Sequence, residues 1–95
     1  MNSSEKPTNQ PSAECQRELD NARNALKRII NDLPREKLRA MNDPVISYLV
    51  MGCDGDVDEY VRLRMGNNAG NAPDVAAFHV AKNLILIKKW FNRQK

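Results

Sequence analysis

The chain has 95 residues, a net charge of +3 and a hydrophobic content of 41%. A chain of this length has material for only one hydrophobic core, which excludes a two-domain protein. No apolar run approaches the roughly 18 residues of a membrane span, and the first residues lack the apolar stretch of a signal peptide. We therefore expect a single cytoplasmic domain without a membrane span.

The first segment, residues 1–11, is rich in Ser, Asn, Pro and Gln and has no apolar residue after Met1. Such a segment cannot bury enough surface to offset the entropy lost on ordering. It predicts a disordered tail, followed by one helical domain over residues 12–95.

Residues 13–33 have the periodicity of an amphipathic helix. Ser12 is the expected N-cap, and Glu14 in the first turn favours the helix dipole. Apolar or small side chains recur at spacings of three and four residues, which predicts one buried seam. They are Cys15, Leu19, Ala22, Leu26, Ile29 and Leu33. Pro34 then ends the helix or starts the next turn, because proline inside a helix loses a hydrogen bond and clashes with the preceding turn.

Two short segments follow. Residues 34–42 predict a short helix with Leu38 and Met41 facing inward. Asp43, followed by a proline, is a suitable start for another helix. The next stretch, residues 45–51 (VISYLVM), is apolar enough for a buried strand, but no partner strand with an alternating pattern appears elsewhere. We therefore predict a helix here.

The stretch MGCDGDVDEY, residues 51–60, resembles a metal-binding loop in its spacing of aspartates. Counted from Asp54, aspartates occupy positions 1, 3 and 5 of a calcium loop. Such a loop also needs glycine at position 6 and a bidentate glutamate at position 12. Glu59 and Met65 stand at those positions. We therefore predict no metal site.

The same stretch is better explained as a joint between two helices. Gly52 ends one helix, Asp56 is the N-cap of the next, and Glu59 three residues later completes a capping box. That next helix is expected to end at Gly66 as a left-handed cap. A connection rich in Gly and Asn follows it.

The last helix is expected to open at Pro73 and Asp74. Its apolar seam has spacings of three and four residues, consisting of Ala77, Val80, Leu84, Ile87 and Phe91. Phe78, Ala81 and Ile85 widen this face, while Leu86 and Trp90 add a second flank. A helix that is apolar nearly all round lies at the centre of a bundle or has a partner on more than one side.

The first and last helices should therefore pack as a long pair, with the short helices across them. The fold class predicted is all-α, a compact bundle of four or five helices. The apolar surplus of the last helix leaves two alternatives open: a well-filled single core, or a surface for a partner or a homodimer.

Cysteine and histidine chemistry points away from an enzyme. Cys15 and Cys53 have no second Cys or His at ligand spacing, which excludes zinc, and two reduced thiols are expected. Carboxylates beside Cys53 raise the pKa of a thiol, which opposes a thiolate nucleophile. His79 is the only histidine. No catalytic or phosphate-binding motif is present, so we expect no catalysis and no cofactor.

Charge is unevenly distributed along the chain. Residues 34–60 hold three basic and six acidic residues, whereas residues 61–95 hold seven basic and one acidic residue. A polarised surface of this kind is suited to contact with a partner of complementary charge. The residues predicted to bind a partner are Lys88, Lys89, Trp90, Arg93 and Lys95 at the basic end, with Asp54, Asp56, Asp58 and Glu59 as an acidic patch.

The sequence thus predicts a small, non-catalytic protein-interaction module. It would be an adaptor, inhibitor or regulatory subunit that docks a helical face on a larger protein. The alternative is a nucleic-acid-binding regulator that uses the basic C-terminal helix. A third view of that helix is purely structural: its Lys and Arg favour the helix dipole, while Trp90 and Phe91 pack inward.

Overall fold

The computed structural model describes residues 10–94, and within this range the chain is all-α. Residues 1–9 of the predicted tail, and Lys95, lie outside the described residues. The elements are α1 (Ala13–Asn31), α2 (Arg35–Ala40), the π-helical turn η1 (Tyr48–Gly52), α3 (Val57–Asn67) and α4 (Pro73–Arg93). No strand occurs among residues 10–94, so the predicted helical fold class is confirmed.

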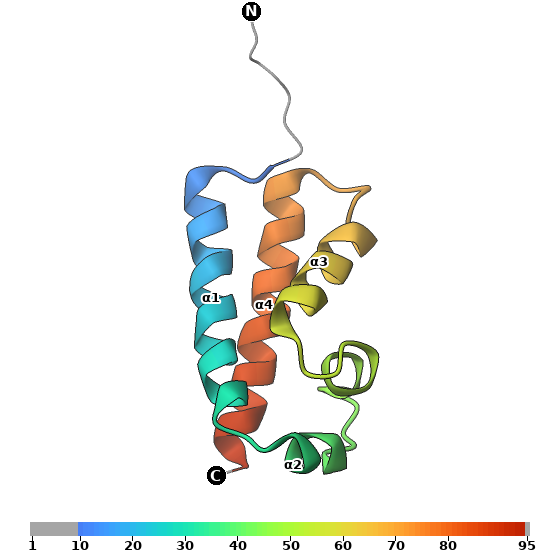
Figure 1. Cartoon of the computed structure of the whole chain (residues 1–95). Coiled ribbons are helices and arrows are strands. Elements are labelled where there is room, and N and C mark those ends of the chain that lie inside the picture. The colour runs from blue at the N-terminus through green and yellow to red at the C-terminus, as the bar shows by residue number, and fades with distance from the viewer. Residues whose placement is uncertain (1–9, 95) are drawn as a thin grey trace, which may run out of the picture.

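The two long helices, α1 and α4, lie side by side and run in the same direction (Figure 1). The backbone N–H of Ser12 donates to Asp74 Oδ1 at 2.6 Å, which joins the start of α1 to the start of α4. α3 packs against both long helices and runs opposite to α4, while α2 crosses the far end of the pair. The predicted long pair therefore forms, and α3 packs across both of its helices.

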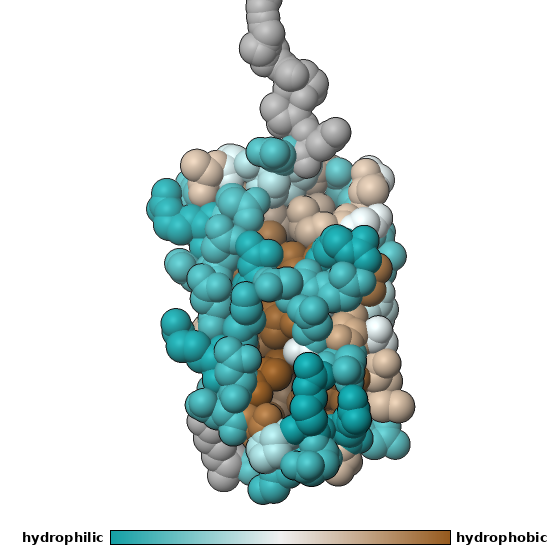
Figure 2. Space-filling view, viewed as in Figure 1, coloured by the Kyte–Doolittle hydropathy of each residue, from teal (hydrophilic) through white to brown (hydrophobic). Residues whose placement is uncertain are grey.

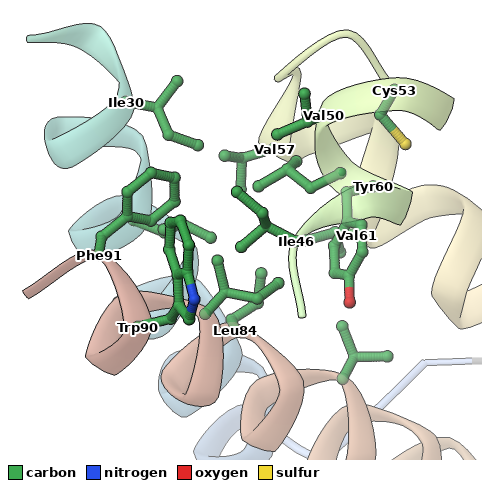
Figure 3. Packing of buried hydrophobic residues seen from close by; sticks show 14 of the residues in the cluster. Ile30, Ile46, Val50, Cys53, Val57, Tyr60, Val61, Leu84, Trp90 and Phe91 are labelled. Carbon is green, nitrogen blue, oxygen red and sulfur yellow. The ribbon is translucent and has the colours of Figure 1, made fainter. Parts of the chain in front are cut away.

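One hydrophobic core holds these elements together. Leu26, Ile46, Leu49, Val80 and Leu84 are fully buried in it and come from α1, α4, η1 and the turn before η1. Figure 3 shows how side chains from these segments and from α3 point toward one another. Burying apolar side chains removes them from water, and this is the main favourable term in folding. Figure 2 shows hydrophilic residues along α1, with a hydrophobic band beside them.

Local signals in the sequence set the helix starts as expected. The Ser12 hydroxyl accepts a hydrogen bond from the Cys15 backbone N–H at 3.3 Å, and Asp56 Oδ1 accepts one from the Glu59 N–H at 3.2 Å. Both are N-caps that satisfy a backbone donor left free in the first turn. Pro73 stands at the first position of α4, where its missing N–H costs nothing.

The predicted capping box at the start of α3 is wrong in its second half. The Asp56 backbone N–H donates to the carbonyl oxygen of Cys53 at 2.9 Å, so it needs no side-chain acceptor. The Glu59 carboxylate instead accepts two hydrogen bonds from Arg62, at 2.9 and 2.6 Å. The charged fork of arginine is the stronger donor to a carboxylate.

The predicted left-handed cap at Gly66 is also wrong. α3 continues through Gly66 to Asn67. The side-chain amide of Asn68 donates to the Arg64 carbonyl at 2.8 Å, and the Asn68 backbone N–H also reaches that oxygen. The exposed carbonyl at the helix end is therefore satisfied without a residue of positive φ.

The segment VISYLVM is helical, as predicted, but it forms a turn and the π-helical η1 rather than a regular α-helix. Asp43 Oδ1 accepts from the Val45 N–H at 2.9 Å, which closes a local turn before η1. After η1 the Gly55 N–H donates to the Leu49 carbonyl at 2.9 Å. This geometry buries Ile46, Leu49 and Val50 on one side.

No helix within residues 10–94 is long and apolar enough to cross a bilayer.

Candidate functional site

The acidic residues predicted to contact a partner are engaged within the chain. Asp54 Oδ2 accepts from Arg35 at 2.9 Å, and Asp54 Oδ1 accepts from Arg39 at 3.4 Å. The hydrogen bond from Arg39 is the largest effect that lowers the pKa of the Asp54 carboxyl below its ordinary value, and Arg35 lowers it further. These contacts attach α2 to the turn before α3.

Asp58 links α3 to α1 in the same way. Its Oδ2 lies 2.8 Å from Lys27 Nζ, and its Oδ1 lies 3.8 Å from Arg23 Nε. With Glu59 bound to Arg62 and Asp56 acting as the N-cap, all four acidic residues have partners inside the fold. The predicted acidic patch is therefore paired with cations of the chain itself, although Asp54 and Asp58 are more than half exposed.

Trp90 was predicted to bind a partner, but the structure places it in the core. Its residual exposure is 8%, and its ring packs edge-on against Phe91 with the centroids 5.2 Å apart. Figure 3 shows both rings pointing toward Ile30 and Leu84. We therefore assign Trp90 to the core. This placement agrees with the purely structural interpretation of the helix end, in which Trp90 and Phe91 pack inward.

Cys53 is buried, with an exposure of 7%. Burial raises the pKa of its thiol, and the nearby carboxylates of Glu59 and Asp56 raise it further. A raised pKa keeps the thiol protonated at neutral pH, which is the opposite of what a nucleophile needs. Within residues 10–94 no group of three His, Cys, Asp or Glu side chains is arranged to hold a metal ion.

Among the described residues, the basic residues of α4 form no ion pair, and neither do Arg17, Arg28, Lys37 and Arg64 of the other helices. Arginines and a lysine of α1, α2 and α3 form ion pairs. Within the part of the chain that the structure describes, no ion pair involves the cations of α4. These are Lys82, Lys88, Lys89 and Arg93. The only acidic residue of α4, Asp74, lies at its opposite end.

Apolar side chains share this exposed side of α4. Val75, Phe78, Ile85 and Leu86 are 43%, 56%, 43% and 55% exposed. The prediction that Phe78 and Ile85 widen the buried face is therefore wrong, because α1 and α3 cover only part of the helix circumference. We define the outer face of α4 as these apolar residues together with Lys82, Lys89 and Arg93. Their spacing places them along one side of the helix.

A cation–π contact joins the two kinds of residue on the outer face. Lys82 Nζ lies 5.6 Å from the centroid of the Phe78 ring. Such a contact holds an ammonium group over an aromatic face without neutralising its charge. The face therefore presents apolar and cationic groups together.

The outer face is a ridge between two hollows. The α1-side hollow, between α1 and α4, has a volume of about 530 Å³ and is lined by Ala22, Ala25, Ile85 and Lys88, among others. The α3-side hollow, between α3 and α4, has a volume of about 440 Å³ and is lined by Arg64, Lys82, Leu86 and several asparagines. A partner that covered the ridge would find space on both sides of it.

Arg64 is held in place beside the α3-side hollow by aromatic rings. Its guanidinium carbon lies 5.4 Å from the ring centroid of Tyr48 and 5.9 Å from that of Tyr60. Its Nε is buried and has no hydrogen-bond partner among the described residues. Arg64 thus adds a cation beside the outer face, at a position that no pattern in the sequence predicted.

The outer face could have been found from the sequence by extending the helical phase of α4. Val75, Phe78, Lys82, Ile85 and Lys89 follow one another at spacings of three, four, three and four, opposite the buried seam. That pattern does not tell which apolar stripe is buried, because the choice depends on where α1 and α3 pack.

Comparisons with protein-family models, with curated proteins and with solved structures find no match for this chain. The class of this protein is therefore described by its fold and by the surface of α4. The chain is an all-α bundle with an exposed, basic and partly apolar helix face.

Proposed function

We propose that this protein is a small, non-catalytic interaction module that docks α4 on a larger protein. Such a module acts as an adaptor, inhibitor or regulatory subunit, by covering a surface of its partner or by holding one of its conformations. The free thiols of Cys15 and Cys53 support a reducing compartment such as the cytoplasm as the place where it works.

The observation that carries this proposal is the combination, on α4, of cations without an ion pair and exposed apolar side chains. Asp54, Asp58 and Glu59 are neutralised by arginines and lysines of the chain itself. The cations of α4 have no such partners in residues 10–94 and lie beside exposed apolar side chains. Apolar groups surrounded by charged groups are the usual composition of a protein interface.

Nucleic-acid binding is the second candidate function, because unpaired cations on one helix suit a phosphate backbone. The burial of Trp90 and Phe91 weighs against it, since neither ring is free to stack on a base. Binding to duplex DNA at low salt, with a steep loss of affinity as salt rises, would favour this second function.

An affinity experiment with a charge-reversed variant tests the proposal. The full chain and the double variant Lys88→Glu/Lys89→Glu are used as baits in lysate of the source cells, and retained proteins are identified by mass spectrometry. Lys37→Glu is the matched control, because Lys37 is an exposed lysine of α2. Circular dichroism checks that all three proteins fold alike.

The proposal predicts a protein that the native chain and the Lys37→Glu control retain and the double variant loses. Reversal of charge at an interface costs several kcal/mol when like charges meet, so the loss should be plain. If nothing is retained, or if the same proteins bind all three baits, the docking role of α4 is wrong.

A further inference from the structure

We infer that the outer face of α4, together with the two hollows beside it, binds an acidic amphipathic helix of a partner protein. This inference rests on the proposed docking function and adds the chemistry of the partner. The expected partner helix places apolar side chains on Phe78, Ile85 and Leu86. Its flanking Asp and Glu side chains pair with Lys82 and Lys89.

Charge complementarity is the first argument. The ridge carries Lys82, Lys89 and Arg93, and the α3-side hollow adds Arg64. Glu18 lines the α1-side hollow and is the only acidic residue in the lining of either hollow. A partner surface with carboxylates compensates this excess, whereas a basic or neutral surface leaves desolvated cations unpaired.

The apolar residues decide against a purely ionic ligand. Phe78 and Leu86 are each more than half exposed. A phosphate backbone would pair with the lysines but would leave these side chains in water. A helix with apolar residues at spacings of three, four and seven covers them, in the manner of helix-in-groove recognition.

The shape of the site favours a helix as the bound partner element over a flat partner surface such as a bilayer. Ala22 and Ala25 line the α1-side hollow together with Glu18 and Asn21, and the small size of the two alanines leaves the space beside Ile85 open. Side chains of a bound helix can enter this space and the hollow on the other side, as ridges enter grooves in helix packing. An anionic bilayer would touch the ridge and leave both hollows unfilled.

A second copy of this chain is a poor occupant. The outer face has three cations and no carboxylate, so two copies facing each other would bring lysines and arginines together. Like charges in contact are unfavourable. The partner is therefore expected to be a different chain.

A displayed-peptide selection tests the inference. A phage library of helical peptides, with leucines fixed at heptad positions and every other position randomised, is selected against the immobilised full chain at physiological ionic strength. The best peptide is then labelled, and its affinity is measured by fluorescence anisotropy for the native chain and for variants. Leu86→Lys removes an apolar group and keeps the face cationic, whereas Lys82→Glu/Lys89→Glu reverses its charge. Met51→Lys is the control, because Met51 is 69% exposed and lies in η1.

The inference predicts that selected peptides are rich in Asp and Glu and that both outer-face variants weaken binding about tenfold or more. Met51→Lys should bind as the native chain does. The inference is overturned if no peptide is enriched, if enriched peptides are basic, or if the affinity for Leu86→Lys is unchanged.

Binding measurements on the same protein also test the other possible partners of the outer face. Tighter binding to duplex DNA or to phosphatidylserine vesicles than to the best peptide also overturns the inference, as does a native chain that sediments as a dimer. If the selection fails while the lysate experiment still finds a partner that depends on Lys88 and Lys89, the partner chemistry is wrong and the docking function stands. If the lysate experiment fails as well, the docking function is wrong too.

Discussion

Asp54 shows how a conspicuous acidic residue can serve the fold rather than a partner. It has positive φ, at 53°, and it precedes Gly55, whose φ is 79°. Two arginines of α2 bind its carboxylate, and Arg35 also donates to its backbone carbonyl at 2.6 Å. The turn leads from η1 into α3, and the ion pairs attach α2 to this turn. At the scale of single residues, the aspartates of this stretch are therefore structural.

The titration of Asp54 tests this assignment. Its pKa is lowered in the folded protein, so the ion pairs are present above the ordinary carboxyl pKa of about 3.9 and are lost as pH falls through the lower folded value. We predict a carboxyl midpoint below that ordinary value by NMR. Arg39→Ala should raise the midpoint, because the Arg39 hydrogen bond is the largest cause of the shift. Arg62→Ala is the control, which should move the pKa of Glu59 and leave Asp54 unchanged. An Asp54 midpoint that ignores Arg39→Ala would contradict the assignment.

Gly55 gives a second prediction at this scale. A Cβ at position 55 would clash with the side chain of Leu38, which is buried at 2% exposure, and the positive φ adds strain. Gly55→Ala should therefore lower the free energy of unfolding by about 1–3 kcal/mol. Gly52→Ala is the matched control, since its nearest contact would be an ordinary 3.8 Å from Tyr48. Urea denaturation measures both. Equal losses of unfolding free energy in the two variants would show that the clash with Leu38 and the positive φ are not the cause of the destabilisation.

At the scale of helices, the sequence predicts what is local and misses what depends on distant residues. Ser12, Asp56 and Pro73 mark helix starts because capping needs only a side chain and the next few backbone groups. The capping box failed because Arg62 competes for Glu59, and the Gly66 cap failed because Asn68 closes the helix end instead. In each case two groups compete for the same hydrogen bond or helix end, and the sequence alone does not show which of them is favoured.

The candidate site was predicted only in part, for the same reason. The basic end of α4 could be seen in the composition of residues 61–95. The pairing of Asp58 with Lys27 spans α3 and α1, so it could not be predicted before the packing was known. Likewise, the choice of which apolar stripe of α4 faces solvent depends on the positions of α1 and α3. It therefore stayed open in the sequence whether the surplus apolar residues of this helix, Phe78 and Leu86 among them, pack in the core or form a surface for a partner.

Neighbouring leucines on the two sides of α4 test this division of the helix. Leu84 is fully buried and Leu86 is 55% exposed. Leu84→Ala should lower the free energy of unfolding by about 2–5 kcal/mol, because it leaves a cavity in the core. Leu86→Ala should change it by less than about 0.5 kcal/mol, as a surface substitution does. Thermal or urea unfolding gives both values. If Leu86→Ala costs as much as Leu84→Ala, the outer face is packed and not free for a partner.

At the scale of the whole molecule, the parallel pair of α1 and α4 sets the distribution of charge. Both helices begin at one end, where the Ser12 N–H binds Asp74, and α4 ends at the other with its unpaired cations. In the middle of the chain, Asp58 joins α3 to α1 and Asp54 joins α2 to the turn before α3. One side of α4 combines cations that form no ion pair among the described residues with exposed apolar side chains, and this side is where we expect a partner.

Site-specific photo-cross-linking tests that central expectation most directly. A photoreactive amino acid is placed at position 86 on the outer face, or at position 51 in η1 as the exposed control, and each protein is irradiated in the source cells. We predict one discrete cross-linked protein from position 86, its loss on adding Lys88→Glu/Lys89→Glu, and no such product from position 51. A discrete product from position 51 alone, or none from position 86, would contradict the assignment of α4 as the docking face.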